Sequence, residues 1–238
     1  MTDQHQHNDS PHGGENLEVM QDAHKYNAFL RSLIRQHARG ATDVVDFGSG
    51  IGTFSDSLDL DVSRITCIET EPTSLAVLEQ KGFRTATSLS ELEDNSVSYL
   101  FSLNVLEHID DDAAIAREML RVLKPGGSLF IYVPAFQVLY TSMDEHVGHV
   151  RRYRRPGLVS LFDNAGFDTH YSAYTDALGF FATLAYRMLD DGKPKPLNTG
   201  AIKLHDRFIF PISRLLSVPC SKLFGKNVML AGTKPAGN

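Results

Sequence analysis

The sequence predicts an α/β protein built on a doubly wound parallel sheet. Strand-like and helix-like segments alternate five times between residues 43 and 133, which is typical of a parallel sheet covered by helices on both faces. A glycine-rich turn follows the first strand-like segment, where such sheets bind their ligands. The chain has 238 residues, and 42% of them are hydrophobic, which is enough for a sizeable core.

Local signals bound the helices and strands of this alternation. Apolar residues at helical spacing predict a first helix over 15–37, before Gly40. The strands are predicted over 43–47, 64–69, 83–87, 97–103 and 128–133. The helices between them are predicted over 53–60, from Pro72 to Gly82, and from Asp110-Asp111-Asp112 to Lys124-Pro125-Gly126-Gly127. Proline suits the first position of a helix, and acids suit the positive end of its dipole.

The chain beyond residue 133 is less regular. A helix is predicted from Pro156 to Gly166, followed by a strand over 168–174 and a last strand over 227–233. The segment at about 176–226 is rich in apolar and aromatic residues, and its four prolines prevent one long helix. We expect a cap insertion that shields a substrate from water, with an extended core or a dimer interface as equal alternatives.

The N-terminal segment is expected to be a disordered tail over residues 1–14. It is polar, and its histidines (His5, His7 and His12) are irregularly spaced, which favours a flexible tail over a metal site. Because no internal repeat or second domain boundary is visible, residues 15–238 are expected to form one domain.

Charge and cysteine content exclude several classes of protein. The net charge is −6, so a global basic footprint for nucleic acid is missing. Cys67 and Cys220 lack the spacing of a disulfide framework or zinc site, which favours a reducing, cytoplasmic location. The longest strongly apolar stretch, 177–186, is too short to span a bilayer, although peripheral membrane contact stays open. The polar N-terminus is no secretory signal, and either a monomer or a homodimer fits.

The glycine turn after the first strand carries the strongest chemical signal. Its pattern is D-x-G-x-G-x-G, with Asp46 two residues before Gly48. A dinucleotide fingerprint requires glycine where Thr53 stands, and a phosphate-binding loop requires an absent Gly-Lys-Ser/Thr ending. An acid repels a pyrophosphate and suits an ammonium group. The turn therefore favours a nucleoside cofactor that carries an amino acid.

A second acid, Glu69, ends the second predicted strand. An acid at this place accepts hydrogen bonds from ribose hydroxyls in nucleotide-binding sheets. Taken alone, Glu69 is better explained as a solvated acid at a strand end. Together with the glycine turn, it favours the ribose role.

Four motifs stand in the order and spacing of a known family: the Asp46–Gly52 run, Glu69, the run 102–109 (SLNVLEHI) and the run 123–127 (LKPGG). With them the chain resembles the Rossmann-like (class I) S-adenosylmethionine-dependent methyltransferases. The resemblance implies a seven-stranded, mostly parallel sheet whose last strand is antiparallel. It also implies S-adenosylmethionine as cofactor, S-adenosylhomocysteine as product, and a small-molecule oxygen, nitrogen or carbon acceptor.

The same resemblance assigns roles to residues. Asp46, Gly48 and Gly50 would hold the methionyl amino group, Glu69 the ribose, and the Asn104 backbone the sulfonium side. The other cofactor-binding candidates are Ser49, Gly52, Thr70, Ser88, Leu89 and Tyr26. The chain departs from the family at two positions: Ser88 beside Leu89 stands where an aspartate commonly reads adenine, and Ser98 where an aspartate often opens the fourth strand.

The loop 144–155, after the fifth strand, holds the catalytic candidates. Methyl transfer requires the acceptor to be aligned and, for a hydroxyl, its proton to be taken up. Histidine titrates near neutrality, and the family often carries a similar Gly-His-x-Arg-Arg-Tyr run, so His149 is the expected base. His146 and Tyr153 are further candidates. The alternative is a charged loop whose histidines only form hydrogen bonds.

Other charged groups near this site are given structural roles or stay open. Glu107 and His108 are interpreted as residues that begin the following helix. The arginines at 151, 152, 154 and 155 could clamp an acidic acceptor or could simply be solvated. No metal is expected.

Three rival functions stay open at the level of sequence. A nicotinamide-dependent oxidoreductase is disfavoured by Thr53 and Asp46. A non-catalytic module that binds S-adenosylmethionine would keep the pocket without turnover. A nucleic-acid methyltransferase is disfavoured by the acidic charge and by the lack of an Asn/Asp-Pro-Pro-Tyr-type motif at the fourth strand.

Overall fold

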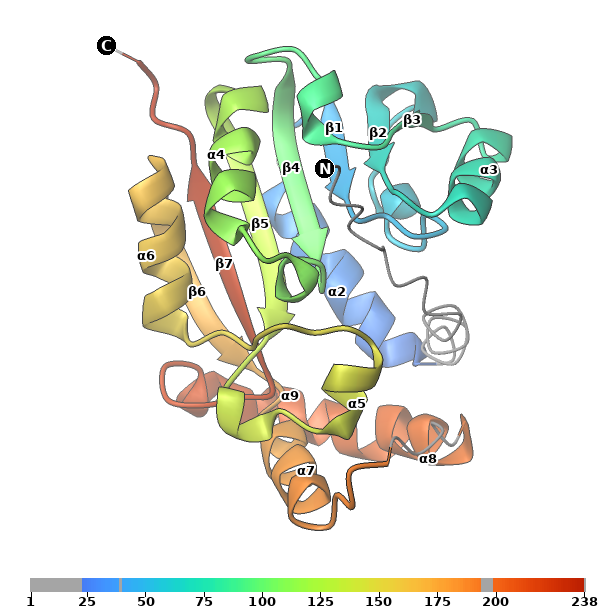
Figure 1. The fold of residues 1–238 in the computed structure, drawn as a ribbon, viewed down its shortest axis with the longest axis vertical. Coiled ribbons are helices and arrows are strands. Elements are labelled where there is room, and N and C mark those ends of the chain that lie inside the picture. The colour runs from blue at the N-terminus through green and yellow to red at the C-terminus, as the bar shows by residue number, and fades with distance from the viewer. Residues whose placement is uncertain (1–22, 39, 194–198, 238) are drawn as a thin grey trace, which may run out of the picture.

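The computed structural model describes residues 23–38, 40–193 and 199–237 (Figure 1). Within them, seven strands form one sheet in the order β3-β2-β1-β4-β5-β7-β6. The strands are β1 (Val44–Phe47), β2 (Ile65–Ile68), β3 (Arg84–Ala86), β4 (Val97–Leu103), β5 (Leu123–Pro134), β6 (Asp168–Thr175) and β7 (Asn227–Thr233). Strands β1 to β5 pair in parallel, and β7 runs antiparallel to both β5 and β6. The predicted doubly wound sheet with an antiparallel last strand is confirmed.

Helices cover both faces of this sheet. They are α2 (His24–His37), α3 (Pro72–Gln80), α4 (Asp112–Val122), α5 (Ser142–His146), α6 (Arg155–Ala165), α7 (Ala177–Met188), α8 (Thr199–Leu204) and α9 (Phe210–Cys220). Alternate strand residues face opposite layers: Val45 packs with the α4 and α6 side chains, and Val44 with those of α2 and α3. The result is a three-layer sandwich in which every residue of β1 is buried.

The predicted helix over 53–60 is wrong. The structure has only a 3₁₀ turn there, Ser55–Ser57. Helix α2 explains the difference, because Arg31 Nη2 donates to Thr53 O at 2.5 Å and Arg35 Nε donates to Ser57 O at 2.5 Å. These carbonyls, which a helix would use for its own ladder, are bonded instead to arginines from a distant part of the chain.

The other predicted elements form close to their expected bounds. The N-terminal helix is described only from His24, and the tail 1–14 lies outside the described residues. Strand β5 begins at Leu123, earlier than predicted, because Leu123 pairs with Val97 and Gly126 N donates to Lys234 O at 2.9 Å. The Lys124–Gly127 run is therefore an irregular start of β5.

The segment between β6 and β7 folds as separate helices beside the carboxyl ends of β4 and β5, at the bottom of Figure 1. A π-helix over His205–Ile209 joins α8 to α9. This helical group reaches α2: both oxygens of Asp206 accept backbone N–H bonds, from Lys25 at 2.9 Å and Tyr26 at 2.8 Å. The Phe210 ring packs edge-on against Tyr26, with 5.3 Å between centroids. None of the helices in the described residues is long and apolar enough to cross a membrane.

Replacing Asp206 with alanine should destabilise the fold, because α2 has no capping side chain of its own at Ala23. We expect a loss of about 1–2 kcal/mol in the free energy of unfolding, measured by urea denaturation. Asp191→Ala, at an exposed acid of the same segment, is the matched control and should change stability by less than about 0.5 kcal/mol. Equal effects of the two substitutions would contradict the capping role of Asp206.

Candidate cofactor and catalytic site

The turn after β1 is held against the end of β2. Gly48 N and Ser49 N both donate to Ile68 O, at 2.9 and 3.1 Å. The φ angles of Gly48, Gly50 and Gly52 are +77°, +52° and +78°, a region that disfavours other residues. The backbone conformation of this turn therefore requires glycine at every second position.

Gly48 also lies against the turn after β4. A Cβ at this position would lie 2.2 Å from Val105 Cγ2, far inside van der Waals contact. The glycine turn and the β4 turn thus approach more closely than any side chain at position 48 would permit. Both turns lie at the carboxyl edge of the sheet, at the point where the strand order reverses, which is where open α/β sheets bind their ligands. We call this edge the crevice.

Asp46 lies in the interior beneath the turn. It is 4% exposed, and its carboxylate accepts a hydrogen bond from Ser55 Oγ at 2.6 Å. Burial, with a smaller contribution from the charge of Glu69, raises the pKa of Asp46 to about 7, although the hydrogen bond from Ser55 lowers it. A cationic group in the crevice would favour the ionised form.

Glu69 is bound by three backbone amides at the edge of the crevice. Its Oε2 accepts from Gly50 N at 2.7 Å, while Oε1 accepts from Thr70 N at 2.8 Å and Glu71 N at 3.1 Å. This arrangement links the ends of β1 and β2 and fixes the carboxylate in place. Because Oε2 carries one of these bonds, it retains acceptor capacity for a hydroxyl.

Asn104 and Tyr26 meet at the end of β4. Asn104 has a φ of +54°, and its N–H donates to Tyr132 O at 2.8 Å. The Tyr26 hydroxyl lies 3.4 Å from that of Tyr132, and burial raises the pKa of Tyr26. Tyr26 therefore lines this edge of the site while its ring packs on Phe210.

Ser88 and Leu89, the adenine candidates, begin a 3₁₀ turn after β3. The Ser88 hydroxyl accepts from Ser90 N at 3.2 Å, and Glu91 accepts from Ser88 N at 3.1 Å, forming a capping box. The Leu89 side chain is 2% exposed in the core. The Leu89 carbonyl also accepts bonds from Arg121 Nη2 at 2.9 Å and Leu92 N at 3.0 Å, so Leu89 serves the core of the fold in this structure.

His149 is oriented by a buried acid. Its Nδ1 lies 2.7 Å from Asp144 Oδ1, and Arg152 makes two bonds to the same carboxylate, at 2.8 and 2.9 Å. Burial alone would raise the pKa of Asp144, but the bonds from His149 and Arg152 hold it well below its ordinary value. An ionised Asp144 places the proton of neutral His149 on Nδ1 and leaves Nε2 as the acceptor.

Glu107 faces this Nε2, with its Oε1 3.8 Å away. The Glu107 side chain is fully buried, and neither carboxylate oxygen has a hydrogen-bond partner among the described residues. Burial raises the pKa of Glu107 to about 8. The interpretation of Glu107 as the residue that begins α4 is wrong, because Asp111 caps that helix through Ala114 N at 2.9 Å.

Glu107, His108 and His149 converge closely enough to share one ion. One ligand atom from each lies within 4.8 Å of the other two, and the two imidazole rings are 4.7 Å apart. The acid-histidine pair directly after β4 was the only sequence signal for this cluster. Its convergence with His149 depends on the loop that follows β5.

Tyr153, Arg151 and Arg152 bind other residues of the chain. The Tyr153 hydroxyl lies 3.0 Å from Leu106 O and 2.8 Å from Asp112 Oδ2, and burial raises its pKa, so it is a poor base. Arg151 pairs with Asp112 at 2.8 Å, as Arg152 pairs with Asp144. These two arginines are therefore engaged within the chain. His146 is half-buried at the last residue of α5.

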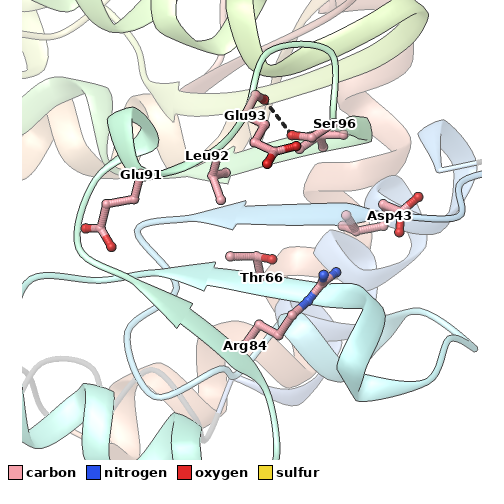
Figure 2. Close-up of a pocket in the computed structure, with 9 residues that line it drawn as sticks. Asp43, Thr66, Arg84, Glu91, Leu92, Glu93 and Ser96 are labelled. Atoms are coloured by element: carbon pink, nitrogen blue, oxygen red, sulfur yellow. Dashed lines mark hydrogen bonds between the residues drawn. The ribbon is translucent and has the colours of Figure 1, made fainter.

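A separate hollow of about 250 Å³ lies at the opposite edge of the sheet (Figure 2). Asp43, Arg84 and Val97 line it at the amino ends of β1, β3 and β4. Ligands of open α/β sheets bind at the carboxyl ends of the strands, so this hollow is not the cofactor crevice.

Comparisons with known proteins agree with this geometry. Residues 45–131 match the family model described as a methyltransferase domain. A probable S-adenosylmethionine-dependent methyltransferase of Mycolicibacterium smegmatis is 27% identical over 161 residues, covering 65% of this chain and 61% of that protein. A ubiquinone biosynthesis O-methyltransferase of Pseudomonas putida is 31% identical over 118 residues, covering 45% and 51%. The chain thus spans about half to three fifths of the length of these relatives.

Solved structures share the fold across most of the chain. A possible histamine N-methyltransferase of Thermotoga maritima has a TM-score of 0.66 at 15% identity, covering 94% of this chain and 97% of that one. A Haloferax volcanii methyltransferase solved with its Trm112 activator has a TM-score of 0.63 at 19% identity, covering 93% of each chain. At these identities the likeness shows the fold alone.

Gly48→Ala should separate the strain of the turn from its contact with Val105. We expect a loss of more than about 2 kcal/mol in unfolding free energy, because a positive φ and a clash coincide there. Gly126→Ala, with the same φ of +77° but open space, should lose only about 1–2 kcal/mol. Gly157→Ala, in α6 with open space, should gain about 0.5–1 kcal/mol. Urea denaturation measures all three, and equal losses at positions 48 and 126 would show that the contact is absent.

Asp46→Asn should stabilise the ligand-free protein at neutral and alkaline pH. Since its pKa is raised from 3.8 to about 7, folding disfavours ionised Asp46, and wild-type stability falls as pH rises between these values. The variant lacks this loss and still accepts the Ser55 hydroxyl. We expect it to gain about 1–3 kcal/mol over wild type at pH 8 and little at pH 4, by urea denaturation. An identical difference at both pH values would refute this assignment.

Proposed function

We propose that the chain is a class I S-adenosylmethionine-dependent methyltransferase, which transfers the methyl group of this cofactor to a small-molecule acceptor and releases S-adenosylhomocysteine. The observation that carries the proposal is the amide-bound carboxylate of Glu69 beside the glycine turn. It presents an acceptor oxygen where a ribose hydroxyl would lie.

The chemistry of the crevice fits this cofactor. Asp46 and Glu69 bring two carboxylates to one edge of the sheet, which suits a sulfonium and an ammonium group and repels a pyrophosphate. A nicotinamide dinucleotide fits this charge poorly. When bound, S-adenosylmethionine supplies a methyl group already activated for displacement, so the protein is left with binding, alignment and proton uptake.

The cofactor roles we propose follow the places of the residues in the crevice. The backbone of Gly48, Ser49 and Gly50, with Asp46 beneath it, would bind the methionyl group. Glu69 and Thr70 would contact the ribose, and the Leu89 main chain with Ser88 the adenine. The remaining contacts with the cofactor would come from Gly52, Asn104 and Tyr26.

For an oxygen acceptor, we assign proton uptake to Nε2 of His149. Asp144 holds the opposite nitrogen at 2.7 Å and would stabilise the imidazolium that forms. The name of the Pseudomonas putida relative, an O-methyltransferase, favours such an acceptor. His146 stays a secondary candidate, and the helices over 177–220 would cover the acceptor.

S-adenosylhomocysteine should raise the melting temperature of the wild-type protein, because it binds only the folded state. Glu69→Gln keeps the shape of the side chain but loses its charge, and it should weaken binding at least about tenfold by calorimetry. Glu93→Gln, at an exposed acid on the opposite edge of the sheet, should bind as wild type does. Stabilisation by NAD instead of S-adenosylhomocysteine would overturn the cofactor assignment.

His149→Gln should leave S-adenosylhomocysteine affinity unchanged and lower kcat for an oxygen acceptor by about 10²–10⁴-fold. Transfer of a labelled methyl group to a panel of phenols, amines and carboxylic acids measures this. His170→Gln, at an exposed residue of β6, is the control. A wild-type protein that binds the cofactor and methylates no acceptor would favour the non-catalytic module.

A further inference from the structure

Most of the exposed large hydrophobic side chains of the described residues lie in the segment 177–223. Eleven of the fifteen exposed large hydrophobic side chains in the described residues lie there. We call this set the cap surface: Phe181, Met188, Leu189, Leu204, Phe208, Ile209, Ile212, Leu215, Leu216, Val218 and Leu223. Isolated exposed hydrophobic residues are common, but this concentration in one segment marks a contact site.

The helical run from α8 to α9 is apolar outward as well as inward. Asp206, Phe210 and Ser213 are buried on its inner side, at the spacing of one helix face. Leu204, Phe208, Ile212, Leu215 and Leu216 recur at intervals of three and four on the opposite side. Leu215 is 74% exposed. The run therefore has a second apolar face, and every one of these five side chains is exposed to solvent in the described part of the chain.

The charges beside this face are nearly all positive. In the described part of 177–226, the exposed lysines and arginines are Arg187, Lys193, Lys203, Arg207, Arg214 and Lys222. Asp191 is the one exposed acid in that part. Asp206 is buried against the α2 amides, and Asp190 accepts bonds from Ser142 at 2.7 Å. This local excess is opposite in sign to the whole chain, whose net charge is −6.

A basic apolar face of this kind matches the surface of an anionic bilayer. Apolar side chains enter the boundary between headgroups and acyl chains, while lysine and arginine contact the anionic headgroups. A second copy of the chain is a poorer occupant, because two cap surfaces would bring like charges together. No described helix could span the bilayer, so contact would be made along the surface.

We propose that the cap surface docks on an anionic lipid bilayer. The helices that carry it lie beside the carboxyl ends of β4 and β5 (Figure 1). Docking would place the acceptor side of the crevice at the membrane. On the premise of the proposed function, the acceptor class is then an amphiphile that resides in the bilayer.

Flotation of the full chain with lipid vesicles tests the docking without reference to catalysis. Vesicles of phosphatidylglycerol and phosphatidylcholine should bind the wild-type protein, and added salt should weaken this binding. Pure phosphatidylcholine vesicles should bind it at least about tenfold less. Equal binding to both kinds of vesicle, or to neither, would overturn the proposal.

Two sets of variants assign the binding to this surface. Leu215→Glu should lower vesicle affinity at least about tenfold, whereas Val62→Glu, an exposed apolar position outside the cap surface, should leave it unchanged. Lys203→Gln and Lys222→Gln should each lower affinity for anionic vesicles about fivefold. Circular dichroism and the melting shift with S-adenosylhomocysteine should match wild type in every variant, which confirms that they fold.

Analytical ultracentrifugation without lipid tests whether a second copy of the chain occupies the cap surface. A monomeric wild-type protein supports the proposal. A dimer that Leu215→Glu dissociates would overturn it and assign the cap surface to a second copy. Because neither measurement uses an acceptor, loss of docking and loss of methyl transfer remain distinguishable.

Discussion

The close approach of three strand ends is the constraint on which the site depends. Ile68 O accepts the amides of Gly48 and Ser49, Glu69 binds Gly50 N, and Val105 fills the space that a Cβ at position 48 would need. These contacts join the ends of β1, β2 and β4 where the strand order reverses. The two turns are therefore fixed relative to each other, because neither can move without breaking a backbone hydrogen bond or a packed contact.

Charge is divided between two parts of the molecule. The carboxyl edge of the sheet gathers Asp46, Glu69, Glu107 and Asp144, two of which have pKa values raised by burial. An acidic crevice of this kind stabilises a cationic ligand and gains stability when the ligand binds. Among the exposed charged side chains of the described helices beside it, lysine and arginine predominate. One chain of net negative charge therefore presents surfaces suited to partners of opposite sign.

The helices between β6 and β7 are part of the architecture of the site. Asp206 caps α2, Phe210 packs on Tyr26, and Tyr26 lies beside Tyr132 near the end of β4. Helix α2 and the helices between β6 and β7, about 180 residues apart in sequence, thus pack together as one side of the site. Displacement of this insertion would also displace Tyr26, which couples the outer helices to the crevice.

The sequence by itself determined the alternation of strands and helices and the glycine turn, because both depend on local backbone geometry and short spacing. It also holds the motifs that carry the resemblance to the S-adenosylmethionine-dependent methyltransferases. Tertiary structure alone decided the rest. Residues 53–60 form no α-helix because Arg31 donates to Thr53 O and Arg35 donates to Ser57 O. Only when the loop after β5 packed on the β4 turn did Glu107 become a buried acid that faces His149 and accepts no hydrogen bond from the described residues. The same packing gave the Tyr153 hydroxyl its contact with Leu106 O. Burial and charge pairing arise from segments distant in sequence, which no local pattern records.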